Sequence, residues 1–332
     1  MNLLGPPFAL YTRFLDRWLR RCAEEPAERQ RDALRKLLST AADTAFGREH
    51  SFARIRTHEE YARAVPIRDY VAFTGWVDRM LTGERDVCWP GEVKFFAQTS
   101  GTTAGDKRIP VTDDMRRSNF RAAMSIFAYY GRRGRSLVSR LVEGQLLFLG
   151  GSTDLTETES GRLIGDLSGI ATQSVHWPIT SHYEPGSELA LIDDWEEKIE
   201  KVARRGVNRD VRFVTGMPSW VKILFGRLCE LAGVDPEGGI SEVWPELSLF
   251  VHGGVNFAPY RSSFDRYIRD DHPLHYLEVY PASEGFIAIQ AEQDENGMEM
   301  LVDNGLFYEF VPLSEWGKDD APRLTIDQVQ TD

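Results

Sequence analysis

The sequence predicts an α/β protein in which a mainly parallel sheet is flanked by helices. Two patterns support this fold class. From residue 93 onward, apolar runs of strand length alternate with amphipathic runs of helix length, as in successive βαβ units. Glycines or small polar residues follow several of the strand-like runs, as expected where strands end in loops. The 332 residues are enough for a large core and for more than one structural unit.

The first 92 residues are predicted to be helical. Residues 10–19 carry an apolar stripe at helical spacing, and Pro26 opens a second helix over 27–38. We interpret the stripe as a core-packing face, with a helix lying on a membrane surface as the alternative. Segment 65–70 has the composition of a turn that leads into a further helix.

Strands and helices alternate through the rest of the chain. Thr112 is a suitable N-cap, because Asp113 and Asp114 then fall in the first helical turn, where the dipole favours carboxylates. Pro218 is placed to occupy the first position of another helix. The expected strands are 93–97, 146–149, 211–215, 247–251 and 275–280, and the expected helices are 112–131, 189–202, 218–231 and 259–268.

The end of the sequence is predicted to be β-rich. Two apolar runs, 298–302 and 306–311, flank the dipeptide Asn304-Gly305. Asn-Gly favours the tight turn of a two-residue hairpin, because both positions tolerate a positive φ. We therefore expect a β-hairpin near the C-terminal end.

Composition excludes several classes of function. The net charge is -12, from 39 basic and 51 acidic residues, which argues against a general nucleic-acid or anionic-membrane surface. The three cysteines are far apart in the sequence, so a disulfide framework is not expected. No apolar run reaches the length of a membrane span, and the first ten residues lack the features of a signal peptide. These observations favour a cytoplasmic protein.

The most distinctive motif is Thr-Ser-Gly-Thr-Thr-Ala-Gly-Asp-Lys at 99–107. Glycines let a backbone approach an anion closely, hydroxyl and N–H groups can donate to it, and Lys107 adds positive charge. The spacing is not that of a Walker loop, since three residues separate Gly101 from Gly105 and Asp106 precedes the lysine. The motif predicts a phosphate-binding loop, with a solvated turn as the alternative.

Three expected strand ends carry glycine or small polar residues: 99–105, Gly253-Gly254 and Ala282-Ser283-Glu284. In open parallel sheets, ligands bind beyond the carboxyl ends of the strands. We therefore expect these three clusters to converge on one crevice.

In this order, the clusters make the chain resemble the auxin-responsive acyl acid–amido synthetases of plants and their bacterial relatives, within the adenylate-forming superfamily. The first motif is 99–110, and the second is Tyr-Pro-Ala-Ser-Glu-Gly at 280–285, which is similar to the family's Tyr-x-Ser-Ser-Glu. Residues 251–255 stand where the superfamily has its adenine-side glycine segment. Residues 214–219 resemble the passage that borders the acyl pocket. The similarity extends over nearly the whole chain.

The resemblance implies ATP-dependent adenylation of a carboxylic acid, followed by transfer of the acyl group to an amine, typically an amino acid. Lys107 and Glu284 are the expected catalytic residues, and Glu284 is the expected Mg²⁺ ligand. Met217, Trp177 and His252 are expected at the acyl pocket. The expected ATP-binding residues are Thr99, Ser100, Gly101, Thr102, Thr103, Gly105, Lys107, Gly253, Gly254, Val255, Tyr280, Ala282 and Ser283.

Two of these residues have an alternative interpretation without a role in the site. Glu284 could be a solvated carboxylate at a strand end. His252 could be a structural histidine that is hydrogen-bonded within the protein.

The resemblance covers the large N-terminal domain of the family, with 1–92 as its helical segment and 93–332 as the adenylating core. The family's third motif, Arg-x-Gly-Asp, and its smaller C-terminal domain do not follow in this sequence, so we expect an incomplete core with low activity by itself. An acyl-CoA ligase of the same superfamily and a non-catalytic nucleotide-binding module are the alternatives. The acid, the amine and the oligomeric state cannot be predicted from these motifs.

Overall fold

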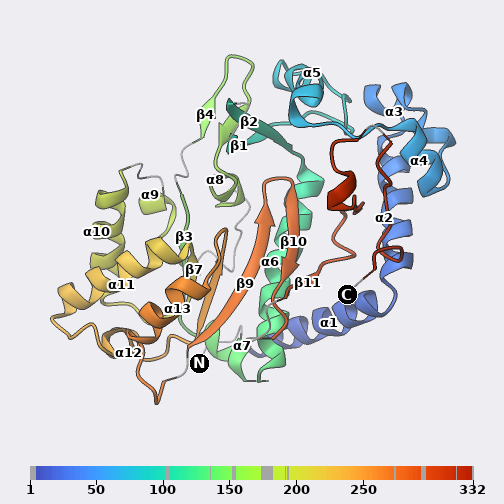
Figure 1. The fold of residues 1–332 in the computed structure, drawn as a ribbon. Helices are drawn as coiled ribbons and strands as arrows, with labels where there is room; N and C mark the ends of the chain where they lie inside the picture. The colour runs from blue at the N-terminus through green and yellow to red at the C-terminus, as the bar shows by residue number, and fades with distance from the viewer. Residues whose placement is uncertain are drawn as a thin grey trace. The chain divides into compact units, whose positions relative to one another are not determined.

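The computed structural model describes residues 5–101, 105–134, 136–151, 155–172, 182–190, 192, 194–272, 274–292, 297–318 and 320–330. The chain divides into two compact units, each assembled from segments that are separate in the sequence (Figure 1). The sheet unit comprises Met1–Asp16, Phe120–Thr156 and Gly165–Met300, and the helical unit comprises Arg17–Asn119, Glu157–Ile164 and Leu301–Asp332. Helices α1 (Gly5–Glu24) and α6 (Asp113–Arg132) contribute residues to both units.

Among the described residues, the sheet unit contains a seven-stranded sheet, here called the large sheet, with strand order β11-β10-β9-β8-β7-β3-β6. Strands β6, β3, β7, β8 and β9 are parallel, and β10 and β11 add an antiparallel edge. The predicted mainly parallel sheet is confirmed. The strands are β3 (Gln145–Leu149), β6 (Tyr183–Glu184), β7 (Val211–Gly216), β8 (Leu249–Gly253), β9 (His275–Ala282), β10 (Gly285–Ile289) and β11 (Glu299–Met300).

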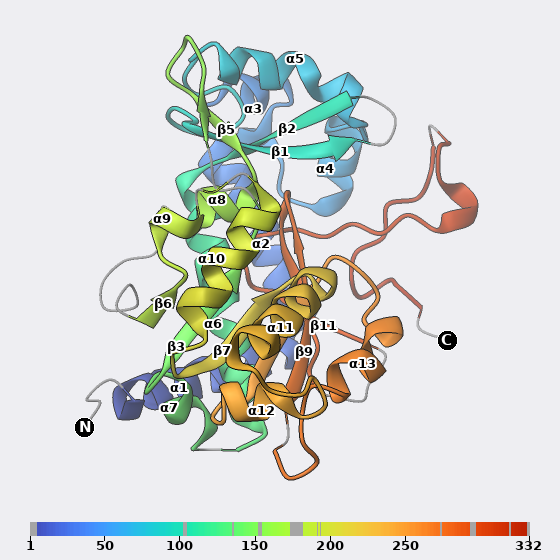
Figure 2. The same ribbon diagram turned by 90° about the vertical axis from the view of Figure 1, so that its left-hand side faces the viewer.

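Helices cover both faces of the large sheet (Figure 2). On one face, α10 to α13 pack their apolar side chains against β3, β7, β8 and β9 in a single buried cluster. On the other face, α6 places Phe127 against Phe213 and Tyr130 against His275. Because both faces are covered, β8 is a continuous buried apolar run from Leu249 to Val251, as is typical of central parallel strands.

The helices of the sheet unit confirm most of the predicted ones. They are α7 (Leu137–Leu141), α8 (Leu167–Thr172), α9 (Ser187–Ala190), α10 (Trp195–Gly206), α11 (Pro218–Ala232), α12 (Gly239–Val243) and α13 (Ala258–Asp265). The single helix expected over 189–202 is wrong, because α9 ends before α10 begins. The Asp194 side chain accepts a hydrogen bond from the Glu197 N–H at 2.7 Å and so caps a new helix there.

The helical unit contains short helices and a small sheet. Its elements are α2 (Pro26–Ala41), α3 (Ala45–Glu49), η1 (Phe52–Arg54), α4 (His58–Ala64), α5 (Tyr70–Leu81) and η3 (Leu313–Glu315), with strands β1 (Phe95–Gly101), β2 (Gly105–Val111), β4 (Thr156–Glu157) and β5 (Leu163–Gly165). The strand order is β2-β1-β5-β4. The core-packing face predicted over 10–19 is correct only in part, since Leu19 is buried but Leu10 and Phe14 are 52% and 59% exposed. The predicted second helix does pack in a core, because Leu34 and Leu38 of α2 are buried beside Phe52.

Antiparallel strands do occur late in the chain, as β9, β10 and β11, but the hairpin expected across Asn304-Gly305 is wrong. The Gln30 side chain, which is only 2% exposed, intervenes between the two expected strands. Its amide nitrogen donates to the carbonyls of Val302 and Leu306, at 2.7 and 3.0 Å, and its oxygen accepts from the Tyr308 N–H at 2.7 Å. Backbone groups that would have paired across a hairpin are therefore satisfied by one buried side chain.

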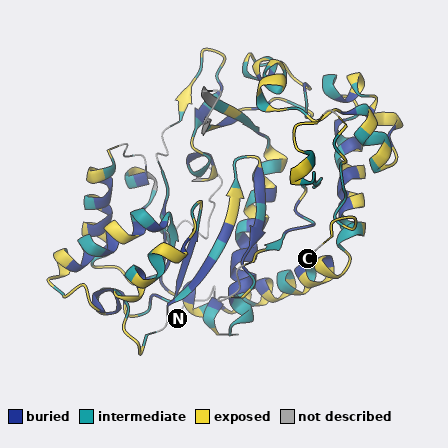
Figure 3. Cartoon of the chain, in the orientation of Figure 1, coloured by how far each residue is buried: buried dark blue, intermediate teal, exposed yellow. Residues whose placement is uncertain are grey.

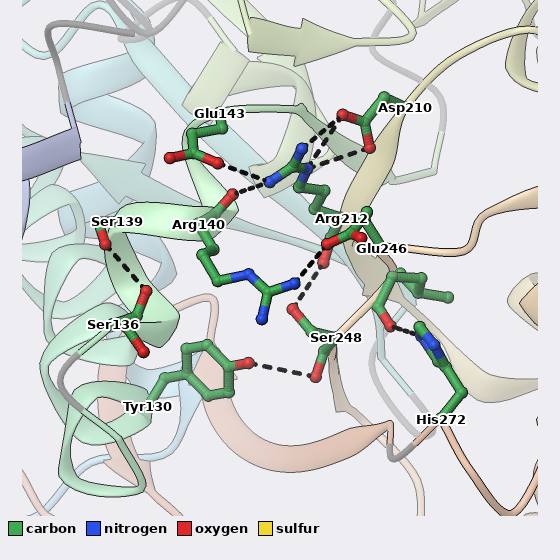
Figure 4. A network of polar contacts seen from close by, with 11 residues as sticks. Tyr130, Ser136, Ser139, Arg140, Glu143, Asp210, Arg212, Glu246, Ser248 and His272 are labelled. Atoms are coloured by element: carbon green, nitrogen blue, oxygen red, sulfur yellow. Dashed lines mark hydrogen bonds and ion pairs between the residues drawn. The ribbon is translucent and has the colours of Figure 1, made fainter. Parts of the chain in front are cut away.

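Polar side chains fill the edge of the large sheet at which the parallel strands begin, here called the amino edge (Figure 4). Arg212 donates to both carboxylate oxygens of Asp210, to Glu143 at 3.0 Å and to the Arg140 carbonyl at 2.8 Å. His272 lies 2.7 Å from the carbonyl of Leu247, just before β8. This network links the segments that lead into neighbouring strands.

Candidate functional site

The described residues of the phosphate-type motif lie at the facing ends of two antiparallel strands in the helical unit. Strands β1 and β2 pair in a register that sets Thr99 opposite Lys107 and Gly101 opposite Gly105. Ser100 therefore belongs to the end of β1, while Thr102 and Thr103 lie outside the described residues. The expectation that the motif follows a strand of the parallel sheet is wrong, because β1 belongs to the small sheet and is followed directly by β2.

Strand β2 was missed because its sequence mixes charge and proline with only two aliphatic residues. The available signal was the pair of glycines, Gly101 and Gly105, placed symmetrically around the turn. After β2, the predicted N-cap is confirmed: Thr112 Oγ1 accepts from the Met115 N–H at 3.1 Å at the start of α6.

Lys107 is half-buried on β2, and its surroundings in the helical unit are aromatic. Its Nζ lies 5.7 Å from the ring centroid of Tyr70, which is within the range of a cation–π contact. The next residue, Arg108, donates its backbone N–H to the Tyr70 hydroxyl at 2.8 Å. Tyr70 was not among the residues predicted for the site, although it ends the segment 65–70 that was predicted to lead into a helix. Its contact with Arg108 joins residues 38 positions apart.

The remaining described candidates belong to the sheet unit, at the edge where its parallel strands end, here called the carboxyl edge. Neighbouring parallel strands end at the same edge, and the register places Thr215 beside Val251 and Gly253 beside Val279. The candidates on this edge are Met217, His252, Gly253, Gly254, Val255, Tyr280, Ala282, Ser283 and Glu284.

Gly253 has a structural reason to be glycine. A Cβ at this position would lie 2.4 Å from the Val279 carbonyl oxygen, so a side chain cannot be accommodated between β8 and β9. Gly254 differs, because it has open space but a φ of 81°, a conformation that glycine adopts without strain. The two glycines therefore allow β8 to end against β9 and then to turn away from the sheet, with half-buried Val255 following.

His252 is 2% exposed and stacks on Phe257, with ring centroids 3.9 Å apart. Burial, with a smaller contribution from the Arg261 charge, lowers the pKa of His252 to about 3, so the imidazole is neutral at physiological pH. Its Nδ1 is buried and has no hydrogen-bond partner among the described residues. Within the described part of the chain, His252 therefore lacks the hydrogen bond at Nδ1 that a structural histidine is expected to form.

The second motif emerges from the core as β9 ends, and Figure 3 shows this strand changing from buried to exposed. Tyr280 is 51% exposed, Ala282 and Ser283 are half-buried, and Glu284 is exposed. Ala282 pairs with Gly285, so Ser283 and Glu284 form the two-residue turn into β10. Met217 is half-buried at the passage from β7 to α11, where Pro218 occupies the first helical turn as predicted.

Two sets of candidates result, one in each unit. The hairpin carries Thr99, Ser100, Gly101, Gly105 and Lys107, and the carboxyl edge carries the nine residues named above. Trp177 lies outside the described residues.

No cluster of three or more His, Cys, Asp or Glu side chains that could hold a metal ion occurs among the described residues. Magnesium does not require one, since it is commonly bound by one or two carboxylates together with substrate phosphates. Exposed Glu284 fits that kind of site. None of the described helices is long and apolar enough to span a membrane.

Comparisons with known proteins agree with this fold. The GH3 family N-terminal domain matches residues 16–194 and 165–274. A curated relative, the probable indole-3-acetic acid-amido synthetase GH3.12 of Oryza sativa subsp. japonica, is 27% identical over 117 residues, or 35% of this chain and 19% of the relative.

Two solved structures are similar in fold. GH3.15 acyl acid amido synthetase superposes with a TM-score of 0.66 at 15% identity, over 85% of this chain and 58% of that chain. AtGH3.15 acyl acid amido synthetase in complex with 2,4-DB gives a TM-score of 0.67 at 16% identity, over 84% and 57%. The chain therefore matches less than two thirds of the length of each of these relatives. Because the family domain matches well over half of its residues, the chain belongs to the GH3 family.

Proposed function

We propose that the protein takes part in the ATP-dependent adenylation of a carboxylic acid and the transfer of the acyl group to an amine, typically an amino acid. The observation that carries this proposal is the β1–β2 hairpin, which holds the glycine- and hydroxyl-rich motif and Lys107 in register. Family membership supports it, as do relatives whose names specify acyl acid and indole-3-acetic acid amido synthetases.

The chemistry explains why such a hairpin is needed. A carboxylate is a poor acyl donor because its leaving group would be an oxide ion. Transfer of AMP from ATP converts it into an acyl-adenylate, whose phosphate leaves readily when the amine attacks. The protein has to align the α-phosphorus with the attacking carboxylate and stabilise the charge of the departing pyrophosphate, which is a task of positioning and electrostatics.

We assign the hairpin to the phosphates. Backbone N–H groups and hydroxyls around Ser100, Gly101, Thr102, Thr103 and Gly105, together with Thr99, would bind the β- and γ-phosphates. Lys107 would stabilise charge on the same phosphates.

We assign the carboxyl edge to the rest of the nucleotide and to the acid. Tyr280, Ala282, Ser283 and the segment 253–255 would lie along the adenosine and the α-phosphate. Glu284 would hold Mg²⁺, which supplies charge neutralisation at the phosphates when it is bound. Met217, Trp177 and His252 would line the acyl pocket, and the neutral imidazole of His252 could bond the acid through Nδ1 without adding charge.

The names of the relatives favour an amine as acceptor over coenzyme A. A cytoplasmic location remains part of the proposal and is supported by three cysteines that are all unpaired, Cys22, Cys88 and Cys229.

The proposal is tested by acid-dependent release of pyrophosphate from ATP. The acid panel should include indole-3-acetic acid and 2,4-DB, and each acid should be offered with amino acids or with coenzyme A. We expect product formation that depends on the amino acid and not on coenzyme A. In Lys107→Ala, pyrophosphate release should fall roughly 10²–10³-fold without loss of folding. Coenzyme A-dependent product, or an unaffected Lys107→Ala, would contradict the proposal.

A further inference from the structure

The aromatic residue at the start of α5 connects the core of the helical unit with the phosphate-type hairpin. The Tyr70 ring packs against a buried cluster that includes Val77, Met80 and Phe96. Asp69 caps α5 by accepting the Ala72 N–H at 2.8 Å, so the helix begins at Tyr70. The ring is thus held both by the core and by the start of a capped helix.

Tyr70 contacts two consecutive residues of β2 in different ways. Its hydroxyl accepts the Arg108 backbone N–H at 2.8 Å, which anchors the strand, and its ring lies 5.7 Å from Lys107 Nζ. One side chain thus contacts both the ammonium group of Lys107 and the backbone of the residue that follows it.

A ring differs from a carboxylate as a partner for a lysine that has to bind phosphate. A carboxylate would neutralise the ammonium group, whereas the face of a ring attracts it and leaves its charge available. Among the described residues, Lys107 forms no ion pair. Lysine has a flexible four-carbon stem, so an unrestrained Lys107 would lose more conformational entropy when it binds phosphate.

We propose that Tyr70 is a positioning residue, which orients Lys107 through its ring and fixes the backbone of β2 through its hydroxyl, so that the lysine is directed to the phosphates of ATP. This inference rests on the proposed function, since it assigns Lys107 to those phosphates.

The test is a double-mutant cycle on the affinity for Mg²⁺–ATP, measured by calorimetry with Tyr70→Leu, Lys107→Met and the double variant. We expect Tyr70→Leu to weaken binding roughly threefold to tenfold in the wild-type background. In the Lys107→Met background the same substitution should change affinity by less than about twofold, because the contact that it removes is already gone. A residue with a merely structural role would give equal effects in both backgrounds.

Phe73→Leu is the matched control, since Phe73 packs on the same buried cluster from the same helix and contacts Phe46. It should cost similar stability and leave ATP affinity unchanged. Tyr70→Phe keeps the ring contact with Lys107 and removes only the hydroxyl, so it should weaken ATP affinity much less than Tyr70→Leu. If Tyr70→Leu does not fold, Tyr70→Met replaces it, because methionine adapts to irregular apolar space.

The outcomes separate the two proposals. Unchanged ATP affinity in Lys107→Met refutes the assignment of Lys107 to the phosphates, and the inference falls with it. Reduced affinity in Lys107→Met together with additive effects of Tyr70→Leu refutes the positioning role of Tyr70 alone. Non-additive effects for Tyr70→Leu, with none for Phe73→Leu, support the inference.

Discussion

The two edges of the large sheet differ in how their polar groups are hydrogen-bonded. At the amino edge, Arg212 is surrounded by Asp210, Glu143 and the Arg140 carbonyl, and the Tyr130 hydroxyl lies 3.4 Å from the Ser248 carbonyl (Figure 4). The bonds from Arg212 to Glu143 and to the Arg140 carbonyl connect β7 with the segment that leads into β3. The Tyr130 hydroxyl connects α6 with the segment that leads into β8.

At the carboxyl edge, strands β8 and β9 lead into glycines, a buried nitrogen without a partner among the described residues, and exposed polar side chains. The buried Nδ1 of His252 has no partner among the described residues, and Glu284 and Tyr280 are exposed at the end of the strand pair. Buried polar groups in folded proteins are normally paired, so an unpaired one requires an explanation. A ligand at the carboxyl edge would provide it, whereas the amino edge needs none.

The largest expected effect is at Glu284. Glu284→Gln keeps the shape of the side chain and removes the charge that a hard cation requires, so Mg²⁺-dependent pyrophosphate release should fall roughly 10²–10³-fold. ATP affinity should change much less, and the melting temperature should stay the same because the side chain is exposed. A magnesium titration curve identical to that of the wild type would show that Glu284 is a solvated carboxylate without a role in metal binding. It would also weaken the contrast between the two edges.

Arg212→Met tests the amino edge. The substitution keeps much of the aliphatic stem and leaves Asp210 and Glu143 without their shared partner, so the free energy of unfolding should fall by about 1–3 kcal/mol. Urea denaturation provides the measurement. ATP affinity should be unchanged. A loss of ATP affinity at equal folding would show that the amino edge also serves a ligand.

His252→Phe tests whether the buried imidazole at the carboxyl edge is neutral in the folded protein. In the wild type, burial lowers the pKa of His252 to about 3, while in the unfolded chain it stays near 6.5. The unfolded state binds more protons below 6.5, so stability is present above that pH and is lost as the pH falls. The wild type should lose about 2 kcal/mol more than the variant between pH 7 and pH 5.

Urea denaturation of both proteins at the two pH values measures this difference. Equal slopes with pH in the two proteins would mean that His252 is protonated in the folded state, contrary to its buried stacking on Phe257.

Arg140→Ala is expected to have the smallest effect. Its guanidinium lies 2.6 Å from Glu246, but the side chains are 57% and 41% exposed, and solvent screens such a pair. The free energy of unfolding should change by less than about 1 kcal/mol. The same urea denaturation assay allows direct comparison with Arg212→Met. A larger loss of unfolding free energy in Arg140→Ala than in Arg212→Met would show that burial of the side chain does not determine its contribution to stability.

Local sequence patterns were sufficient to predict most helices and strands of the sheet unit. The apolar runs at 211–215, 247–251 and 275–280 became β7, β8 and β9, because both faces of a central parallel strand are covered and its sequence is correspondingly apolar. Proline at the start of α11 and the Thr112 cap marked helix starts for equally local reasons. Of the three glycine-rich or small polar clusters, Gly253-Gly254 and 282–284 lie at the carboxyl edge of the large sheet, whereas the described residues of 99–105 belong to the small sheet.

Predictions failed where a distant residue competes with a local preference. Asn304-Gly305 favours a hairpin, yet Gln30 supplies three hydrogen bonds to the flanking backbone and displaces the strand pairing. Strand β2 exists because β1 offers it an antiparallel partner, although its own composition is a weak strand signal. In both cases the decisive bond joins segments whose proximity no local pattern encodes.

The sequence by itself determined the fold class, which segments form the parallel strands, and which residue types follow each strand. These features depend on periodicity and on side chains that are close in the chain. Only the tertiary structure decided that Tyr70 contacts Lys107, that Gly253 is required by the Val279 carbonyl, and that the buried Nδ1 of His252 has no partner among the described residues. Such contacts depend on the distance between segments in space, and that distance is set by packing of the whole core.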